Sequence, residues 1–218
     1  MLTIVEEILL LVLDEKTGKF QDRLPVHSLR HAASGAVLME LALNDRIDTD
    51  VHQLFVVDPK PLGEPVLDRS LARIVADGGN RPTSHWVGAF AEEYDSLQRQ
   101  LLDRLVERGI LARHEERLLW VFGSRRYPVV EGSPLRDVKR RIMDVLLTDT
   151  IPDPRDVVII CLADACALWH SLIHPRELAG MEPRIAQVVK LDLIGQSVAR
   201  TIRELQDATR GLEAKWFK

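Results

Sequence analysis

The stretch Leu2–Phe20, LTIVEEILLLVLDEKTGKF, contains the apolar run Ile8–Leu13. A membrane span needs about 20 apolar residues, and a signal peptide needs a core of about 7–15 behind a basic start. This run is shorter than either, and no Lys or Arg precedes it. Thr3 and Glu6 have the spacing of a capping box, in which each side chain bonds a free backbone N–H at a helix start. The stretch therefore predicts a buried helix that ends in the turn Asp14–Gly18.

The composition is that of an ordinary globular protein. The 218 residues are 46% hydrophobic and 28% charged, enough to bury a full core. No long linker rich in Gly, Ser or Pro divides the chain, so we expect a single domain over residues 1–218. The formal net charge of −4 argues against a nucleic-acid partner, because general nucleic-acid binders are basic. Two cysteines are too few for a disulfide framework and favour reduced thiols in a cytoplasmic protein.

Apolar periodicity predicts a mainly α fold, a single-domain helical bundle with one or two short β-hairpins. A strand pair is expected within Ile47–Val57. A hairpin is expected over Ile110–Phe122, with the polar turn His114–Arg117 between two apolar arms. The expected helices cover residues 28–43, 66–76, 94–108, 134–147, 155–173 and the region from 182 onward.

No catalytic or metal centre emerges from the sequence. The strongest candidate set is Cys161, Cys166, His170 and His174. On one straight helix Cys161 points away from the other three, so the four cannot surround a zinc ion tetrahedrally. We interpret them as packing residues. Glycine-rich nucleotide loops and nucleophile motifs are absent, so we expect no enzyme, no cofactor and no metal.

Two other features suggest a membrane surface. The first is an unbroken apolar pentad, Leu118, Leu119, Trp120, Val121 and Phe122. Consecutive strand residues face opposite sides, so both faces of this segment are apolar. The second is a basic stripe of Arg136, Lys139 and Arg140 at helical spacing. Apolar side chains beside cations are typical of interfacial membrane binding. The alternative is a core strand pair with a solvated basic face.

Four blocks then resemble the Golgi phosphoprotein 3 family in their order and spacing. They are LTIVEEILLLVLDEKTGKF, GAVLMELALNDRI, RLVERGIL and RDVVIICLADA, and the resemblance extends from Leu2 to Ala167. It implies a mostly helical domain that lies on membranes, recognises phosphatidylinositol 4-phosphate and inserts an apolar hairpin. That hairpin falls on Leu118–Phe122. Eukaryotic members work at the Golgi, where they link glycosyltransferases to vesicle coats.

The lipid site of the family is not matched. Its tryptophan falls on Pro25, its arginine before a glycine falls on Ser34, and its two arginines fall on Asp95 and Gln98. Substitute headgroup residues are sought among the arginines near these positions and near the pentad: Arg30, Arg99, Arg125, Arg126, Arg136 and Arg140. The arginine cluster that precedes the domain in eukaryotic members has no counterpart ahead of Leu2, so we expect a prokaryotic relative.

Two functions are consistent with these features. The first is a non-enzymatic, cytoplasmic, peripheral membrane protein that binds anionic phospholipid and a client protein. The second is a soluble interaction module whose apolar hairpin mediates homo-oligomers or partner binding, since a hairpin buried between subunits has the same sequence pattern.

Overall fold

The computed structural model describes residues 1–15, 17–20, 24, 26–50, 53–78, 80–115, 125–130, 134–191 and 198–205. Helices make up most of this part of the chain, together with two short antiparallel strand pairs. The prediction of a mainly α fold with one or two short hairpins is therefore confirmed.

The first helix, α1 (Ile4–Leu11), is the buried helix that the opening stretch predicts. Thr3 Oγ1 accepts a hydrogen bond from Glu6 N at 3.3 Å, and Glu6 Oε2 accepts one from Thr3 N at 2.7 Å. These two bonds form the expected capping box. All residues of α1 are buried, and the apolar run continues buried to Leu13.

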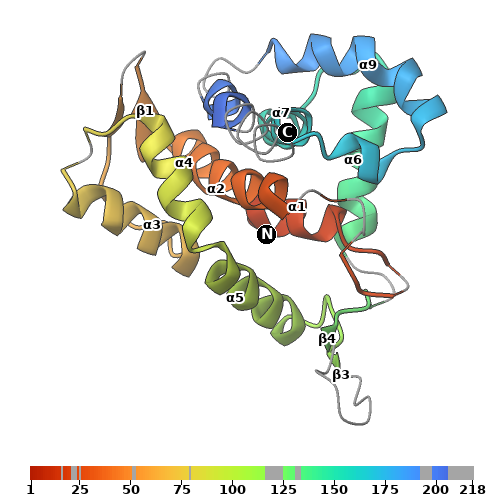
Figure 1. Ribbon diagram of the computed structural model, residues 1–218, viewed down its shortest axis with the longest axis horizontal. Helices are drawn as coiled ribbons and strands as arrows, with labels where there is room; N and C mark the ends of the chain where they lie inside the picture. Colours follow the sequence, from red (N-terminus) through yellow and green to blue (C-terminus); the bar gives the residue numbers. More distant parts are fainter. Residues whose placement is uncertain are drawn as a thin grey trace, which may run out of the picture.

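Helices α1 and α2 (Val26–Leu43) lie at the centre of the molecule (Figure 1). On one side α2 contacts α3 (Pro65–Ala76) and α4 (Thr83–Glu92), and on the other it contacts α7 (Pro154–Ala165). The predicted helix 28–43 is thus confirmed, and it organises the core.

Gly35 lies in the middle of α2 because two neighbouring segments approach it closely. A Cβ atom at this position would lie 2.5 Å from Leu162 Cδ2 of α7 and 2.9 Å from Ile202 Cδ1. Any larger residue would push these segments apart. The close packing that Gly35 allows compensates for the low helix propensity of glycine.

The remaining elements cover the two sides of this centre. The expected strand pair is present as β1 (Ile47–Thr49) and β2 (Leu54–Val56). On the opposite side, α6 (Pro134–Leu147) has the bounds that the sequence predicts, and it packs on α1, α7 and α9 (Pro175–Val189).

The prediction of one helix over residues 155–173 is wrong. Helix α7 ends at Ala165, and Ala167 has φ of 54°, a left-handed conformation that interrupts a right-handed helix. The short helix α8 (Trp169–Leu172) follows, and His174 then caps α9. Helix α9 also begins earlier than the predicted start at residue 182.

Buried apolar side chains from Leu2 to Ile202 form one connected core cluster. The single-domain assignment stays a prediction. Among the described residues, no helix has both the length and the apolar character that a membrane crossing requires.

Candidate functional site

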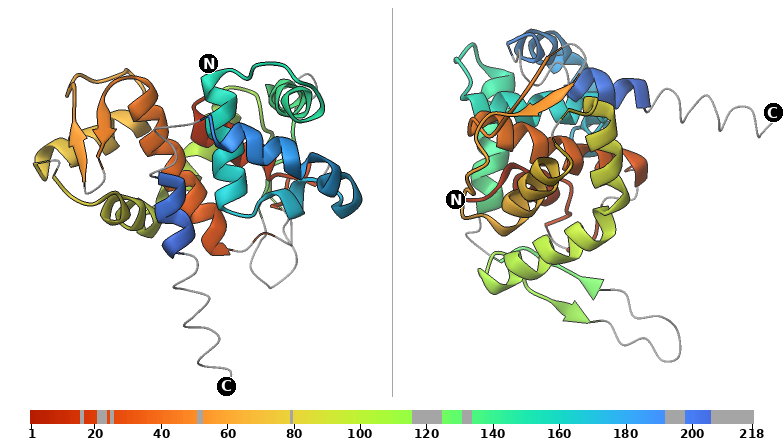
Figure 2. Two further views of the ribbon diagram at one scale, coloured as in Figure 1. Left: turned by 90° about the horizontal axis from the view of Figure 1, so that it is seen from above. Right: turned by 90° about the vertical axis from the view of Figure 1, so that its left-hand side faces the viewer.

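The β3–β4 strand pair projects from one end of the helical body, beside the end of α5 (Tyr94–Glu107) (Figures 1 and 2). Strand β3 (His114–Glu115) pairs with β4 (Arg125–Arg126) in antiparallel register. The two strands come immediately before and after the segment 116–124, which contains the apolar pentad.

The predicted turn His114–Arg117 is wrong at its first two residues, because His114 and Glu115 form a strand. The described partner arm of β3 begins at Arg125, after the pentad rather than within it. Leu118, Leu119, Trp120, Val121 and Phe122 lie outside the described residues, so their membrane role stays a prediction.

The base of the strand pair rests on the turn that follows α1. Tyr127 N donates to Gly18 O at 2.9 Å, and Val129 N donates to Glu15 O at 3.4 Å. Gly18 has φ of 63°, and a Cβ atom there would lie 2.1 Å from Pro128 N. Only glycine permits both the positive φ and the close approach of Pro128, so Gly18 is the residue on which the β3–β4 strand pair packs.

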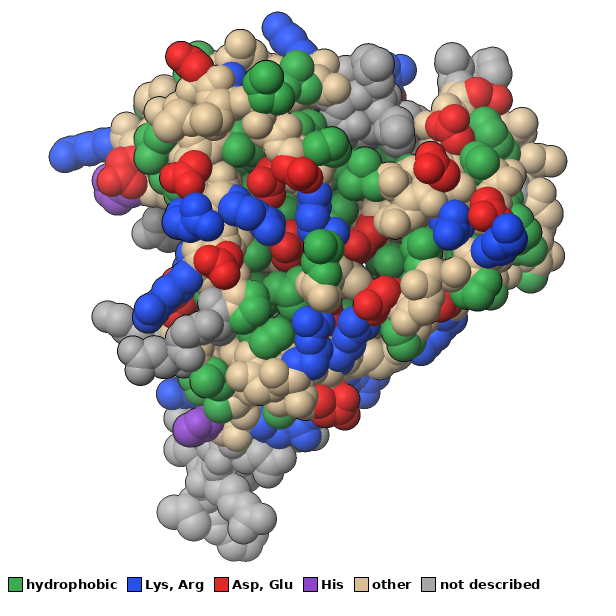
Figure 3. All heavy atoms as spheres, turned by 180° about the vertical axis from the view of Figure 1, so that it is seen from behind, with side chains coloured by type: hydrophobic (Ala, Val, Ile, Leu, Met, Phe, Trp, Pro, Cys, Tyr) green, Lys and Arg blue, Asp and Glu red, His purple; other side chains and the backbone are tan. Residues whose placement is uncertain are grey.

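The basic stripe on α6 is largely neutralised by neighbouring acids. Lys139 Nζ lies 2.5 Å from Glu15 Oε1, and Arg140 pairs with Asp144 at 3.3 Å and with Asp137 at 4.0 Å. Arg136 is exposed and has no partner among the described residues. Figure 3 shows acidic and basic side chains interleaved over one face of the molecule. The stripe therefore carries less net charge than the sequence suggests.

The described positions that the resemblance aligns with the family lipid site lie on α2 and α5, which the Arg30–Asp95 ion pair connects. Arg30 Nη2 on α2 lies 3.0 Å from Asp95 Oδ1 and 3.1 Å from Asp95 Oδ2 on α5. Ser34 Oγ donates to Arg30 O at 3.0 Å, and Gln98 Nε2 donates to the Tyr94 hydroxyl at 2.8 Å. Asp95 is thus a counter-ion that the chain itself supplies to Arg30. Pro25 lies outside the described residues.

Tyr94, which contacts Arg30, is buried, and His31, the next residue in the sequence, is half-buried. The guanidinium carbon of Arg30 lies 5.9 Å from the centroid of the Tyr94 ring, a cation–π arrangement. Burial, with the charge of Asp95 as a second cause, raises the pKa of Tyr94. Burial, followed by the neighbouring His27, lowers the pKa of His31. Both groups are therefore neutral near pH 7, which leaves the charge balance to Arg30 and Asp95.

The other proposed headgroup arginines are dispersed. Arg99 Nε donates to the backbone oxygen of Asp95 at 3.0 Å, which places it next to the Arg30–Asp95 pair. Arg125 and Arg126 belong to β4, and the structure describes only the backbone of Arg125. The predicted set thus separates into an α2–α5 group and a group around the strand pair and α6.

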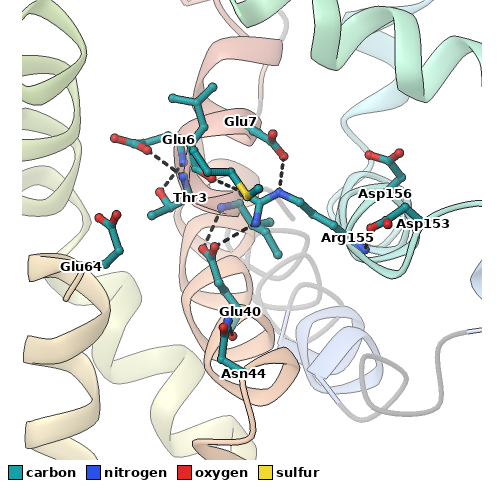
Figure 4. Close-up of polar contacts among 12 residues, drawn as sticks. Thr3, Glu6, Glu7, Glu40, Asn44, Glu64, Asp153, Arg155 and Asp156 are labelled. Atoms are coloured by element: carbon teal, nitrogen blue, oxygen red, sulfur yellow. Dashed lines mark hydrogen bonds and ion pairs between the residues drawn. The ribbon is translucent and has the colours of Figure 1, made fainter. Parts of the chain in front are cut away.

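A buried ion-pair network under the N-terminus is the largest feature that the sequence does not predict (Figure 4). Arg155 lies between Glu7 Oε2 and Glu40 Oε1, at 3.0 Å from each. It also donates to Leu2 O, while Glu40 Oε2 accepts from Ile4 N at 2.8 Å. Arg155 therefore joins α1, α2 and α7 through one guanidinium group.

Further arginines extend this buried ion-pair network to two more helices. Arg141 of α6 bridges Glu7 at 3.2 Å and Asp156 at 3.1 Å. Arg104 of α5 lies 3.2 Å from Glu6, whose side chain is fully buried. A signal for this network does exist in the sequence, because glutamates inside apolar runs need partners when buried. The sequence does not indicate which arginines supply them.

The cysteine and histidine candidates are divided between a buried and an exposed group. Cys161 and Cys166 are free thiols in the core, and burial raises the pKa of Cys166. His170 and His174 lie near the surface on α8 and at the start of α9. In the described part of the chain, no three Cys, His, Asp or Glu side chains are grouped as metal ligands would be.

Comparison with known families agrees with this architecture. The model of the Golgi phosphoprotein 3 (GPP34) family matches residues 4–205. The chain therefore belongs to the Golgi phosphoprotein 3 family.

Two fungal proteins illustrate the relationship. Both are named vacuolar protein sorting-associated protein 74. The protein from Eremothecium gossypii is 29% identical over 79% of this chain and 61% of its own length. The protein from Schizosaccharomyces pombe is 31% identical over 69% of this chain and 50% of its own length. The chain thus spans between half and about three fifths of these relatives. Both relatives are eukaryotic, so they give no support to the expectation of a prokaryotic member.

Proposed function

We propose that this protein is a non-enzymatic peripheral membrane protein that binds anionic phospholipid through Leu118–Phe122 and nearby arginines. In this proposal the pentad enters the boundary between headgroups and acyl chains, and cations near it meet the anionic headgroups. The chain also recruits a client protein to the membrane. The names of the two fungal relatives associate those proteins with vacuolar protein sorting.

The single observation that carries the proposal is the position of the β3–β4 strand pair. The pair begins and ends on either side of the pentad, and its base is bonded to the turn after α1. Strands β3 and β4 lie at one end of the body, beside α5, so the described chain stops and resumes at this end. An apolar segment flanked by Arg125 and Arg126 has the composition of an interfacial anchor.

Vesicle flotation tests the proposal. The wild-type chain is mixed with phosphatidylcholine vesicles that contain phosphatidylinositol 4-phosphate, phosphatidylserine or neither. We expect co-flotation with both anionic compositions and little with phosphatidylcholine alone. The variant Trp120→Asp/Phe122→Asp should lose flotation, because two added carboxylates oppose insertion and are repelled by the anionic surface.

The control is Val57→Asp/Val75→Asp, which adds the same charges at two exposed apolar positions away from the strand pair. This control should float like the wild-type chain. Absence of wild-type flotation would contradict the proposal. If the hairpin variant instead converts a wild-type oligomer to monomers in light scattering, without a change in flotation, the pentad serves self-association.

A further inference from the structure

A cavity of about 640 Å³ lies between the turn after α1 and the junction of α8 with α9. One wall comes from Asp14, Thr17, Lys19 and Phe20, and the other from residues 170–175, far away in the sequence. This volume is in the range of pockets that hold small ligands. None of the sequence-derived headgroup residues lines it.

The polar part of the lining is rich in hydrogen-bond donors. Lys19 and His170 line the cavity, and both are exposed without an ion-pair partner among the described residues. His174 also lines it, and its Nδ1 accepts from Arg176 N at 3.4 Å. A neutral imidazole that accepts at Nδ1 carries its proton on Nε2, so His174 retains a donor. The hydroxyl of Ser171 adds another.

One acidic side chain, Asp14, belongs to the described lining. Its Oδ1 accepts from Thr17 N at 2.7 Å and from Thr17 Oγ1 at 2.8 Å, so it stabilises the turn from within. The described lining thus has one cation, Lys19, and one carboxylate, Asp14, and its histidines and Ser171 add further hydrogen-bond donors. The site consequently favours an anion with several acceptor oxygens.

The rest of the lining is apolar. Phe20, Leu172 and Ile173 are half-buried and pack against the core. An inorganic ion would leave these side chains in contact with water. A ligand with an apolar group next to its anion would cover them and gain free energy from the burial.

We propose that this cavity binds the phosphate monoester of an amphiphile, with Lys19, His170, His174 and Ser171 around the phosphate. A phosphate monoester offers three strong acceptor oxygens to these donors. In the α2–α5 group, Arg30 is already paired with Asp95, whereas Lys19 and His170 have no described counter-ion. The preference for a lipid as source of the phosphate rests on the proposed function.

Isothermal titration of the full chain tests the site without a membrane. The probes are short-chain phosphatidic acid below its micelle concentration, phenyl phosphate and inorganic phosphate. We expect both organic probes to bind more tightly than inorganic phosphate, and a preference between them identifies a lipid or a soluble ester as the source. Lys19→Gln/His170→Gln should weaken binding of the organic probes at least about tenfold, the size of a lost charge-assisted hydrogen bond.

Two variants keep the outcome specific. Lys60→Gln/His85→Gln removes the same residue types at exposed positions outside the cavity, and it should bind as the wild-type chain does. Trp120→Asp/Phe122→Asp should also bind the soluble probes normally while losing vesicle flotation. Equal affinity for inorganic phosphate, or unchanged affinity in Lys19→Gln/His170→Gln, would overturn the inference. Failure of flotation alone would instead overturn the proposed membrane function.

Discussion

The arginine–carboxylate pairs under the N-terminus and on the α2–α5 surface have the same chemistry but differ in burial. The side chains of Arg155, Glu7 and Glu40 are 18%, 4% and 8% exposed. Those of Arg30 and Asp95 are 31% and 68% exposed. Removing one partner of a buried pair leaves an uncompensated charge, whereas an exposed partner is replaced by water.

This difference separates the charges that maintain the fold from those that set the surface potential. Arg155 connects three helices, and separating it from Glu7 and Glu40 would lower the free energy of unfolding. Asp95 contributes little to stability but cancels the charge of Arg30. The same residue types thus have structural roles inside the molecule and electrostatic roles at its surface.

The largest expected effect is on stability, and it follows from removing the arginine at the centre of the buried ion-pair network. Arg155→Ala should lower the free energy of unfolding by about 3–5 kcal/mol, because the buried Glu40 loses its cation and the buried Glu7 keeps only Arg141. Urea unfolding measures the change. Arg140→Ala is the matched control, because Arg140 is 65% exposed and should contribute less than about 1 kcal/mol. Equal effects of the two substitutions would contradict the comparison.

Gly18→Ala should have the next largest effect. The new Cβ would meet Pro128 N at 2.1 Å, so we expect a loss of about 1–3 kcal/mol and faster tryptic cleavage in β4. Gly63→Ala is the control, because Gly63 has φ of 82° but no atom within 4 Å of the new Cβ. It should cost about 1–2 kcal/mol from backbone strain alone and leave cleavage in β4 unchanged. If cleavage in Gly18→Ala is unchanged, Gly18 does not support the β3–β4 strand pair.

A smaller effect concerns pH. Burial raises the pKa of Glu40, although Ile4 N–H and Arg155 partly oppose the shift. A carboxyl with a raised pKa favours the fold most below its ordinary range, and this contribution is lost as pH rises through the raised value. The stability of the wild-type chain relative to Glu40→Gln should therefore decline as the pH rises above the ordinary carboxyl range of about 4. Urea unfolding across this range tests the sign, and a rising difference would contradict it.

The smallest effect on stability is expected for Asp95→Asn. Loss of this exposed pair should change the free energy of unfolding by less than about 1 kcal/mol. Arg30 would then keep its full charge, and binding to phosphatidylserine vesicles should tighten about fivefold, or about 1 kcal/mol per added charge. High salt should reduce the gain. Asp103→Asn, which frees Arg113 from its exposed partner instead, shows whether the α2–α5 position matters. Unchanged vesicle binding in Asp95→Asn would place Arg30 away from the membrane.

Local patterns in the sequence predict much of the fold. The capping box of Thr3 and Glu6 and the bounds of α6 follow from residue spacing and from residues typical of helix ends. The break at Ala167 is missed because a left-handed residue other than glycine leaves no mark in an apolar run. The turn of the second hairpin is misplaced at its first two residues, because His114 and Glu115 pair with β4 instead of forming the turn.

The candidate sites depend on contacts between distant parts of the chain, which spacing does not reveal. The positions of Ser34, Asp95 and Gln98 follow from the family resemblance, but the Arg30–Asp95 pair joins residues 65 positions apart. The cavity next to Lys19 forms because His170 lies opposite the turn that follows α1. Its lining is therefore visible only in three dimensions.

Insertion of the pentad is the central claim, and a fluorescent label within it gives the most direct test. Val121→Cys provides the attachment point, because the thiols of Cys161 and Cys166 are buried and will not react. With anionic vesicles, an NBD label at this position should shift its emission to the blue and be quenched by lipid-borne quenchers. A label at Lys60→Cys should do neither. Emission typical of water from position 121 in vesicle-bound protein would contradict the account.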